Sequence, residues 1–199
     1  MSKTDGDSSK RQQKKALRWA LTIFLVTIAV SATISFVSGE VMDRSSMAVA
    51  FLILLFIVAV GIVFDIVGVA VTSADEKPFH SMASRRVSGA REAIRLLRNA
   101  EKVSSICNDV VGDICGVVSG AASATIAARA IMYLDFSWPQ LVSLGMSALV
   151  AGLTVGGKAI GKTVAMNSCT EIVFLVGQIL ATFDRWKNWP RKKITKKKG

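Results

Sequence analysis

The stretch MAVAFLILLFIVAVGIVFDIVGVAV, residues 47–71, decides the class of fold. Asp65 is its single charged residue, and the remaining residues are apolar side chains or glycine. An α-helix needs about 20 apolar residues to cross a hydrocarbon core about 30 Å thick, and this stretch exceeds that length. Residues 47–72 are therefore predicted to span a membrane as one helix.

Three more apolar stretches support the same interpretation, in a chain of 199 residues of which 51% are hydrophobic. Further spans are predicted at about residues 19–38, 104–134 and 141–162. A signal peptide is the alternative for the first span, but its apolar core is longer than the usual 7 to 15 or so residues. The prediction is an all-α fold, an integral membrane helical bundle over residues 16–183.

The polar segments and one short apolar segment complete the domain prediction. Residues 88–99 are amphipathic, with Ala90, Ile94 and Leu97 on one face, and predict a helix at the cytoplasmic membrane surface. Residues 171–183 are apolar but too short to cross, so we expect a re-entrant or interfacial helix. The basic ends, residues 1–15 and 184–199, are predicted to be cytoplasmic tails, the first of them disordered.

Lysine and arginine are distributed unevenly along the chain. Six precede the first span, seven lie between the second and third spans, and eight follow Phe183, whereas the two remaining loops hold only Arg44. The positive-inside rule then places both termini in the cytoplasm of a multi-pass plasma-membrane protein, in a bacterial or archaeal inner membrane. The net charge of +11 is explained by this orientation in the lipid bilayer, so no nucleic-acid partner is expected.

Several polar side chains interrupt the predicted spans close to their cytoplasmic ends. Charged groups at membrane depth are costly, so they usually face a protein interior or a water-filled path and indicate a functional site. Because the predicted topology puts them at one depth, we expect them to share one site. They are Asp65, Asn108, Asp109, Asp113 and Lys158.

Small residues form stripes on the same helices, and such stripes let membrane helices approach closely. Gly112, Gly116 and Gly120 follow one another at four-residue spacing, and Gly152, Gly156, Gly157 and Gly161 lie on the fourth span. We predict that they serve helix packing, within one chain or between two copies.

No residue set predicts an enzyme. The three cysteines have neither CxxC nor zinc-ligand spacing, and no Ser/His/Asp set shares a location. Residues 156–163, GGKAIGKT, fit the phosphate-loop pattern, which requires a strand before it and a helix after it. An apolar span precedes it instead, so helix packing is the preferred interpretation.

Three motifs carry a resemblance to a known family. They are residues 89–103, GAREAIRLLRNAEKV, then Ile106-Cys-Asn-Asp109, and finally Gly157-Lys-Ala-Ile-Gly-Lys162. With them, residues 64–183 resemble the transmembrane domain of the cyclin-M and CorB/CorC family of magnesium transporters. The resemblance implies three core transmembrane helices, a cytoplasmic juxtamembrane belt and a homodimer. In place of the CBS domains that the family often carries, we expect a separate regulatory subunit.

The resemblance also implies a site for Mg²⁺, with Asn108, Asp109, Asp65 and Asp113 as the metal ligands. Lys158 stands where the family has a glutamate, and an ammonium offers no oxygen to a hard cation. Three interpretations stay open for it. In the first, Lys158 replaces the charge of the metal by pairing with Asp65, Asp109 or Asp113. In the second, it moves or deprotonates in an exchange cycle. In the third, its side chain extends to the membrane surface.

Two functions follow from these interpretations. The first is transport of magnesium or another divalent cation, or regulation of that transport, through the polar intramembrane site. The alternative is a non-transporting membrane scaffold or regulator in which Lys158 replaces the bound cation.

Overall fold

The computed structural model describes residues 4–134 and 138–188, with side chains described between residues 17 and 183 apart from 43 and 134–137. This part of the chain consists of helices joined by short turns, with no strand among the described residues, which confirms the all-α prediction. The elements are α1 (Thr4–Arg44), α2 (Met47–Ser73), α3 (Lys77–Ser84), α4 (Ala90–Leu97), α5 (Ala100–Ser105), the π-helix η1 (Ile106–Val111), α6 (Gly112–Leu134), α7 (Pro139–Asn167) and α8 (Cys169–Asn188).

Four helical segments are long and apolar enough to cross a membrane. They cover Leu17–Met42, Met47–Ser73, Ala100–Tyr133 and Pro139–Asn167, in agreement with the four predicted spans. The third combines α5, η1 and α6. Four such helices are compatible with a multi-pass membrane protein.

Several boundaries differ from those expected from sequence. Helix α1 begins at Thr4, where a disordered tail was predicted; the lysine, arginine, glutamine and alanine residues from Lys10 onward are good helix formers that extend the span. Helix α8 has 20 residues, although its apolar part, Cys169–Phe183, is too short to count as a span. Helix α4 occupies the interior of the predicted surface helix. Helix α3 was not predicted.

The chain divides into two compact units. The first unit contains residues 1–57 and 113–150. Its buried apolar side chains include Met42, Leu54, Val118 and Ile126. Arg129 Nη1 donates a hydrogen bond to the backbone carbonyl of Ser45, 3.2 Å away, at the turn between α1 and α2. A charged side chain thus satisfies a carbonyl beyond the end of α1.

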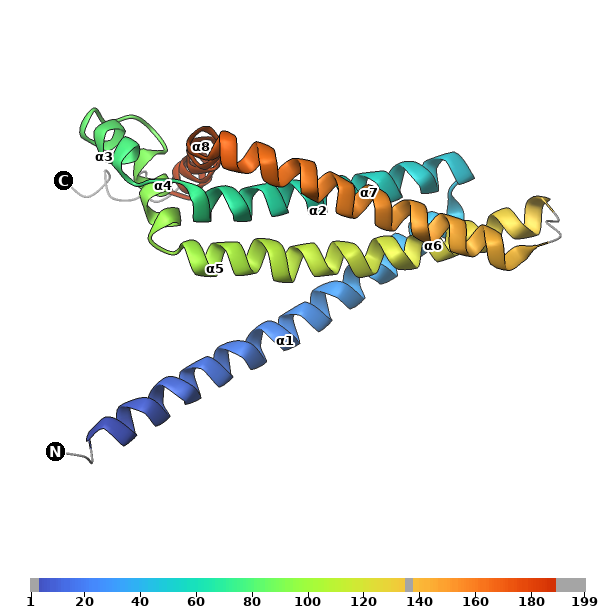
Figure 1. The fold of residues 1–199 in the computed structure, drawn as a ribbon, viewed down its shortest axis with the longest axis horizontal. Coiled ribbons are helices and arrows are strands. Elements are labelled where there is room, and N and C mark those ends of the chain that lie inside the picture. The colour runs from blue at the N-terminus through green and yellow to red at the C-terminus, as the bar shows by residue number, and fades with distance from the viewer. Residues whose placement is uncertain (1–3, 135–137, 189–199) are drawn as a thin grey trace, which may run out of the picture. The chain divides into compact units, whose positions relative to one another are not determined.

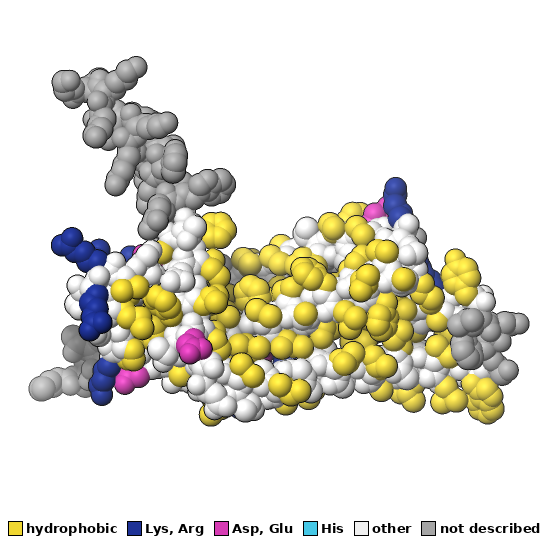
Figure 2. All heavy atoms as spheres, turned by 90° about the horizontal axis from the view of Figure 1, so that it is seen from above, with side chains coloured by type: hydrophobic (Ala, Val, Ile, Leu, Met, Phe, Trp, Pro, Cys, Tyr) yellow, Lys and Arg dark blue, Asp and Glu magenta, His cyan; other side chains and the backbone are white. Residues whose placement is uncertain are grey.

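The second unit contains residues 58–112 and 151–199. Helices α3, α4 and α8 gather at one end of its long helices (Figure 1). At that end Figure 2 shows lysine and arginine side chains, while hydrophobic side chains cover the long helices. The arrangement has the charge distribution of a helical bundle with a polar membrane-surface layer.

A hydrophobic core joins the short helices of this unit to the long ones. Its fully buried members come from α2, α3, α4, α7 and α8, and they are Ala70, Val71, Phe79, Ala93, Ala165 and Val173. Close approach of α4 and α8 depends on glycine: a Cβ at Gly177 would lie 2.5 Å from the carbonyl oxygen of Gly89 and 3.0 Å from the amide nitrogen of Ala93. The surface helices are therefore fixed to the bundle by packing rather than by polar contacts alone.

Candidate functional site

An ion pair lies inside the second unit, on two helices that are candidate membrane spans. Lys158 Nζ of α7 is 3.4 Å from Asp65 Oδ1 of α2. The side chain of Asp65 is 17% exposed and that of Lys158 is 31% exposed. Each charge offsets the cost of removing the other from water. Of the three carboxylates considered from sequence, Asp65 is the partner of Lys158.

Glycines make room for this pair. A Cβ at Gly112 would lie 3.3 Å from Lys158 Nζ, so the ammonium occupies space that a larger residue would fill. On α7, a Cβ at Gly157 would clash with Ile62 Cδ1, and one at Gly161 would lie 2.8 Å from Ile66 Cγ1. These glycines flank Lys158 and bring α7 close to α2, which lets a short ion pair form.

Asn108 lies at a second polar position in the same unit. Its carboxamide packs against Gly68 of α2, where a Cβ would overlap Asn108 Oδ1. Asn108 Nδ2 donates to Ser104 Oγ at 3.2 Å. Asn108 Oδ1 is buried and accepts no hydrogen bond from any described residue. Burying an acceptor without a hydrogen-bond donor costs free energy, so an atom of this kind needs an explanation, such as a functional role.

The local backbone around Asn108 is a π-helix, η1. Single π turns inside α-helices are rare and frequently occur at functional sites. The next residue, Asp109, is exposed and accepts a hydrogen bond from Ser105 Oγ at 2.7 Å. The π turn therefore presents two successive polar residues in different environments, one against α2 and one at the surface.

The predicted metal ligands are not gathered into one carboxylate cluster. Over residues 4–134 and 138–188, no group of three or more His, Cys, Asp or Glu side chains is placed to hold a metal ion. Asp65 is paired with Lys158, whereas Asp109 and Asp113 are exposed. With an ammonium beside the mostly buried carboxylate of Asp65, the arrangement does not fit a family-type Mg²⁺ site. Metal binding by Asn108, Asp109, Asp65 and Asp113 stays a prediction.

The glycines predicted to pack helices have different surroundings. Gly112 lies beside Lys158, as described above. A Cβ at Gly116, Gly120, Gly152 or Gly156 would meet no atom within 4 Å in the described part of its own unit. Their role in packing stays a prediction. Residues 156–163 lie within the continuous helix α7, so the phosphate-loop pattern forms no loop.

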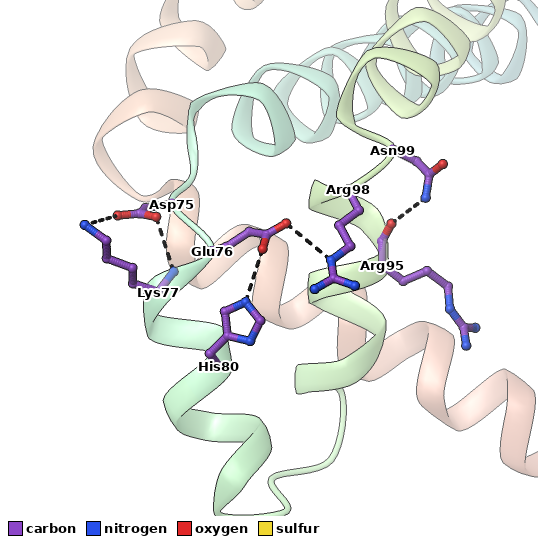
Figure 3. A network of polar contacts seen from close by, with 7 residues as sticks. All are labelled: Asp75, Glu76, Lys77, His80, Arg95, Arg98 and Asn99. Carbon is purple, nitrogen blue, oxygen red and sulfur yellow. Dashed lines mark hydrogen bonds and ion pairs between the residues drawn. The ribbon is translucent and has the colours of Figure 1, made fainter.

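A polar network at the surface helices was not predicted from sequence (Figure 3). Glu76 Oε2 lies 3.1 Å from His80 Nε2, and Glu76 Oε1 lies 3.7 Å from Arg98 Nε. Glu76 thereby links the start of α3 to the end of α4. The four-residue spacing of Glu76 and His80 is the one sequence signal for it.

No family model, curated protein or solved structure matches the chain. The fold gives the class, a helical protein with four candidate membrane spans, two of which carry the Asp65–Lys158 ion pair.

Proposed function

We propose that the chain is a plasma-membrane protein related to magnesium transporters, and that it regulates cation transport without conducting the ion itself. Lys158 supplies, in covalently fixed form, the positive charge that a bound cation supplies in a transporting relative. The observation that carries the proposal is the 3.4 Å contact between Lys158 Nζ and Asp65 Oδ1.

The chemistry of the pair supports a closed site. Mg²⁺ requires an octahedron of oxygen ligands at about 2.1 Å, and an ammonium both lacks such oxygens and repels a second cation. A divalent ion at Asp65 would have to displace Lys158 first. Both side chains are mostly buried, so the contact is screened less than a surface pair. The ground state that this geometry favours is one without metal.

The resemblance over residues 64–183 supports the class of protein. A layer of surface helices, α3, α4 and α8, accompanies the long helices of the second unit, as a juxtamembrane belt would (Figure 1). As a regulator, the protein acts through a partner, either a second copy of itself or a separate subunit. Such a partner would pack on the helix faces whose glycines have open surroundings within their own units. These glycines are Gly116, Gly120, Gly152 and Gly156.

A second candidate function is cation transport itself, and Asn108 is the observation that favours it. Its buried Oδ1 has no hydrogen-bond donor among the described residues, and it belongs to a π turn. A carboxamide oxygen is a ligand for a hard cation. In a transporting state Lys158 would leave Asp65, and the two side chains, Asp65 and Asn108, would supply oxygens.

The proposed orientation places both termini and the surface helices in the cytoplasm. It is supported by the seven basic residues between the second and third spans, against a single arginine, Arg44, in the two opposite loops. Cysteines introduced at His80 and Ser46 test it in a background without Cys107, Cys115 and Cys169. An impermeant maleimide added to intact cells should label Ser46→Cys alone, and labelling of His80→Cys instead would reverse the orientation.

Thermal stability in Mg²⁺ separates the two functions. The wild type should not respond to millimolar Mg²⁺, whereas Lys158→Glu should gain a stabilisation, about 2.7 kcal/mol if Mg²⁺ reaches 100 times its Kd. Lys162→Glu is the matched control, because Lys162 is exposed and one turn further along α7. An equal gain in both variants would show only a surface charge effect. A wild-type response that Asn108→Ala removes would establish the second function instead.

Ion flux into liposomes measures the activity directly. The wild type should be inactive for Mg²⁺ uptake if Lys158 closes the site by its contact with Asp65. Uptake by the wild type that is abolished by Asp65→Asn would overturn the regulatory function in favour of transport.

A further inference from the structure

A groove lies among the surface helices of the second unit. It has a volume of about 310 Å³ and is lined from α4, α8 and the beginning of the third span. This volume is at the lower end of those of small-molecule sites. Its apolar lining consists of Leu96, Val103, Leu180 and Phe183, and Glu92, Arg95 and Asn99 add polar groups.

The apolar lining is continuous with the membrane-embedded part of this unit. Val103 belongs to the third candidate span, Ala100–Tyr133. On α8, Leu180 is 40% exposed and Phe183 is 64% exposed, whereas Val173 of the same helix is buried in the core that contains Ala93 of α4. Amphipathic helices at a membrane surface place such side chains at the boundary between headgroups and acyl chains. Lipid is therefore the neighbour that this groove meets.

The polar lining carries a cation without a carboxylate partner. Among the described residues no Asp or Glu forms an ion pair with Arg95, and Glu76 pairs with His80 and Arg98. In Figure 3 the Arg95 side chain extends away from that network, and its backbone carbonyl accepts a hydrogen bond from Asn99 Nδ2 at 2.9 Å. Glu92 is near enough to line the groove but does not pair with Arg95.

The charge around the groove is complementary to an anion. Residues 91–102 contain Arg91, Arg95, Arg98 and Lys102 against Glu92 and Glu101, and with Glu76, which pairs with Arg98, the net charge is +1. A guanidinium with free N–H groups binds phosphate in a bidentate manner. A ligand that suits both the guanidinium and the apolar lining has a phosphate joined to an apolar chain, as a phospholipid does.

We propose that this groove binds one anionic phospholipid of the surrounding membrane. Arg95 contacts the phosphate, and an acyl chain lies along Leu96, Leu180 and Phe183. The bound lipid fills the space between α4, α8 and the start of the third span, so it stabilises the docking of α8. This role is independent of the ion pair at Asp65 and Lys158.

The test uses the full-length protein, purified in a neutral detergent and titrated with dioleoylphosphatidylglycerol or dioleoylphosphatidylcholine in mixed micelles. Phosphatidylglycerol should raise the melting temperature and remain bound in native mass spectrometry, and phosphatidylcholine should do neither. Arg95→Gln should weaken phosphatidylglycerol binding about fivefold, the effect expected of one basic residue near an anionic lipid. Arg91→Gln is the matched control, because Arg91 is on the same helix outside the groove.

The outcomes separate a lipid site from its alternatives. Equal losses in Arg95→Gln and Arg91→Gln, or equal binding of the two lipids, would overturn the proposal in favour of general surface charge. Stabilisation by free glycerol 3-phosphate as strong as that by phosphatidylglycerol would show a soluble anion site instead. If Arg95→Gln is unstable in every condition, Arg95→Lys decides, since it keeps the charge and should retain part of the lipid preference. Loss of that preference in Arg95→Lys would also overturn the proposal.

Discussion

The carboxamide of Asn108 in η1 fits against the backbone of Gly68 in α2, where no side chain larger than hydrogen has space. The fit explains why a glycine stands inside α2, where glycine ordinarily costs stability. It also holds the π turn in place, because the side chain of its third residue is confined between α2 and Ser104.

Gly68→Ala should therefore destabilise the protein, by about 1–3 kcal/mol, because the added Cβ overlaps Asn108 Oδ1. The measurement is the free energy of unfolding in mixed micelles. Gly152→Ala is the control, because its Cβ would meet open space within its unit, and it should be neutral or stabilising. The double variant Gly68→Ala/Asn108→Ala should recover part of the loss. Equal effects of the two single variants would contradict this assignment.

Removal of Lys158 alone should be more harmful than removal of the whole ion pair. Lys158→Ala leaves Asp65 without its cation in a mostly buried place, so we expect a loss of about 1–3 kcal/mol after allowance for partial exposure. The double variant Asp65→Asn/Lys158→Gln should lie closer to the wild type, since neither charge remains to be desolvated. A double-mutant cycle of thermal denaturation measures the coupling energy, and a value of zero would rule out a structural role for the pair.

Much of this fold could be predicted from sequence, because membrane spans have a strong local signal. Residues 47–71 exceed the length of the hydrocarbon core and contain one charge, so no tertiary information was needed. Helix α3 lacks such a signal. It is eight residues long and its apolar anchor, Phe79, becomes fully buried only when α2, α4 and α8 assemble around it. Short helices of this kind depend on tertiary packing.

The candidate site was predictable in its composition but not in its pairing. Sequence placed Asp65, Asp109, Asp113 and Lys158 at a similar depth, and rotation of each helix about its axis then decides which side chains meet. The structure directs Asp65 toward Lys158 and exposes Asp109. The π turn shifts the register of the residues around Asn108, and the pattern of apolar residues does not indicate such a turn.

Arg129 should contribute more to stability than the nearby Arg44. Arg129 donates to the carbonyl of Ser45 from a partly buried position, whereas Arg44 pairs with Glu40 at the surface and its side chain is 81% exposed. Hydrogen bonds from charged groups contribute about 1.5–3 kcal/mol, and surface ion pairs contribute about 0–1 kcal/mol. Arg129→Gln should therefore lower the melting temperature clearly and Arg44→Gln should barely change it. A larger effect of Arg44→Gln would contradict the role assigned to Arg129.

The packing of α8 on α4 gives a prediction about local stability. In Gly177→Ala the added Cβ meets backbone atoms of Gly89 and Ala93, which cannot rotate away as a side chain can. Gly89 cannot compensate readily, because its φ of +92° is a conformation that favours glycine. Helix α8 should therefore separate from α4. Relative to the wild type, the variant should show a larger increase in amide hydrogen exchange over residues 169–183 than over residues 47–57. Thr182→Ala, an exposed position on the same helix, should leave the exchange pattern unchanged. Uniformly faster exchange in Gly177→Ala would instead show that the contact stabilises the whole protein and not the surface helices in particular.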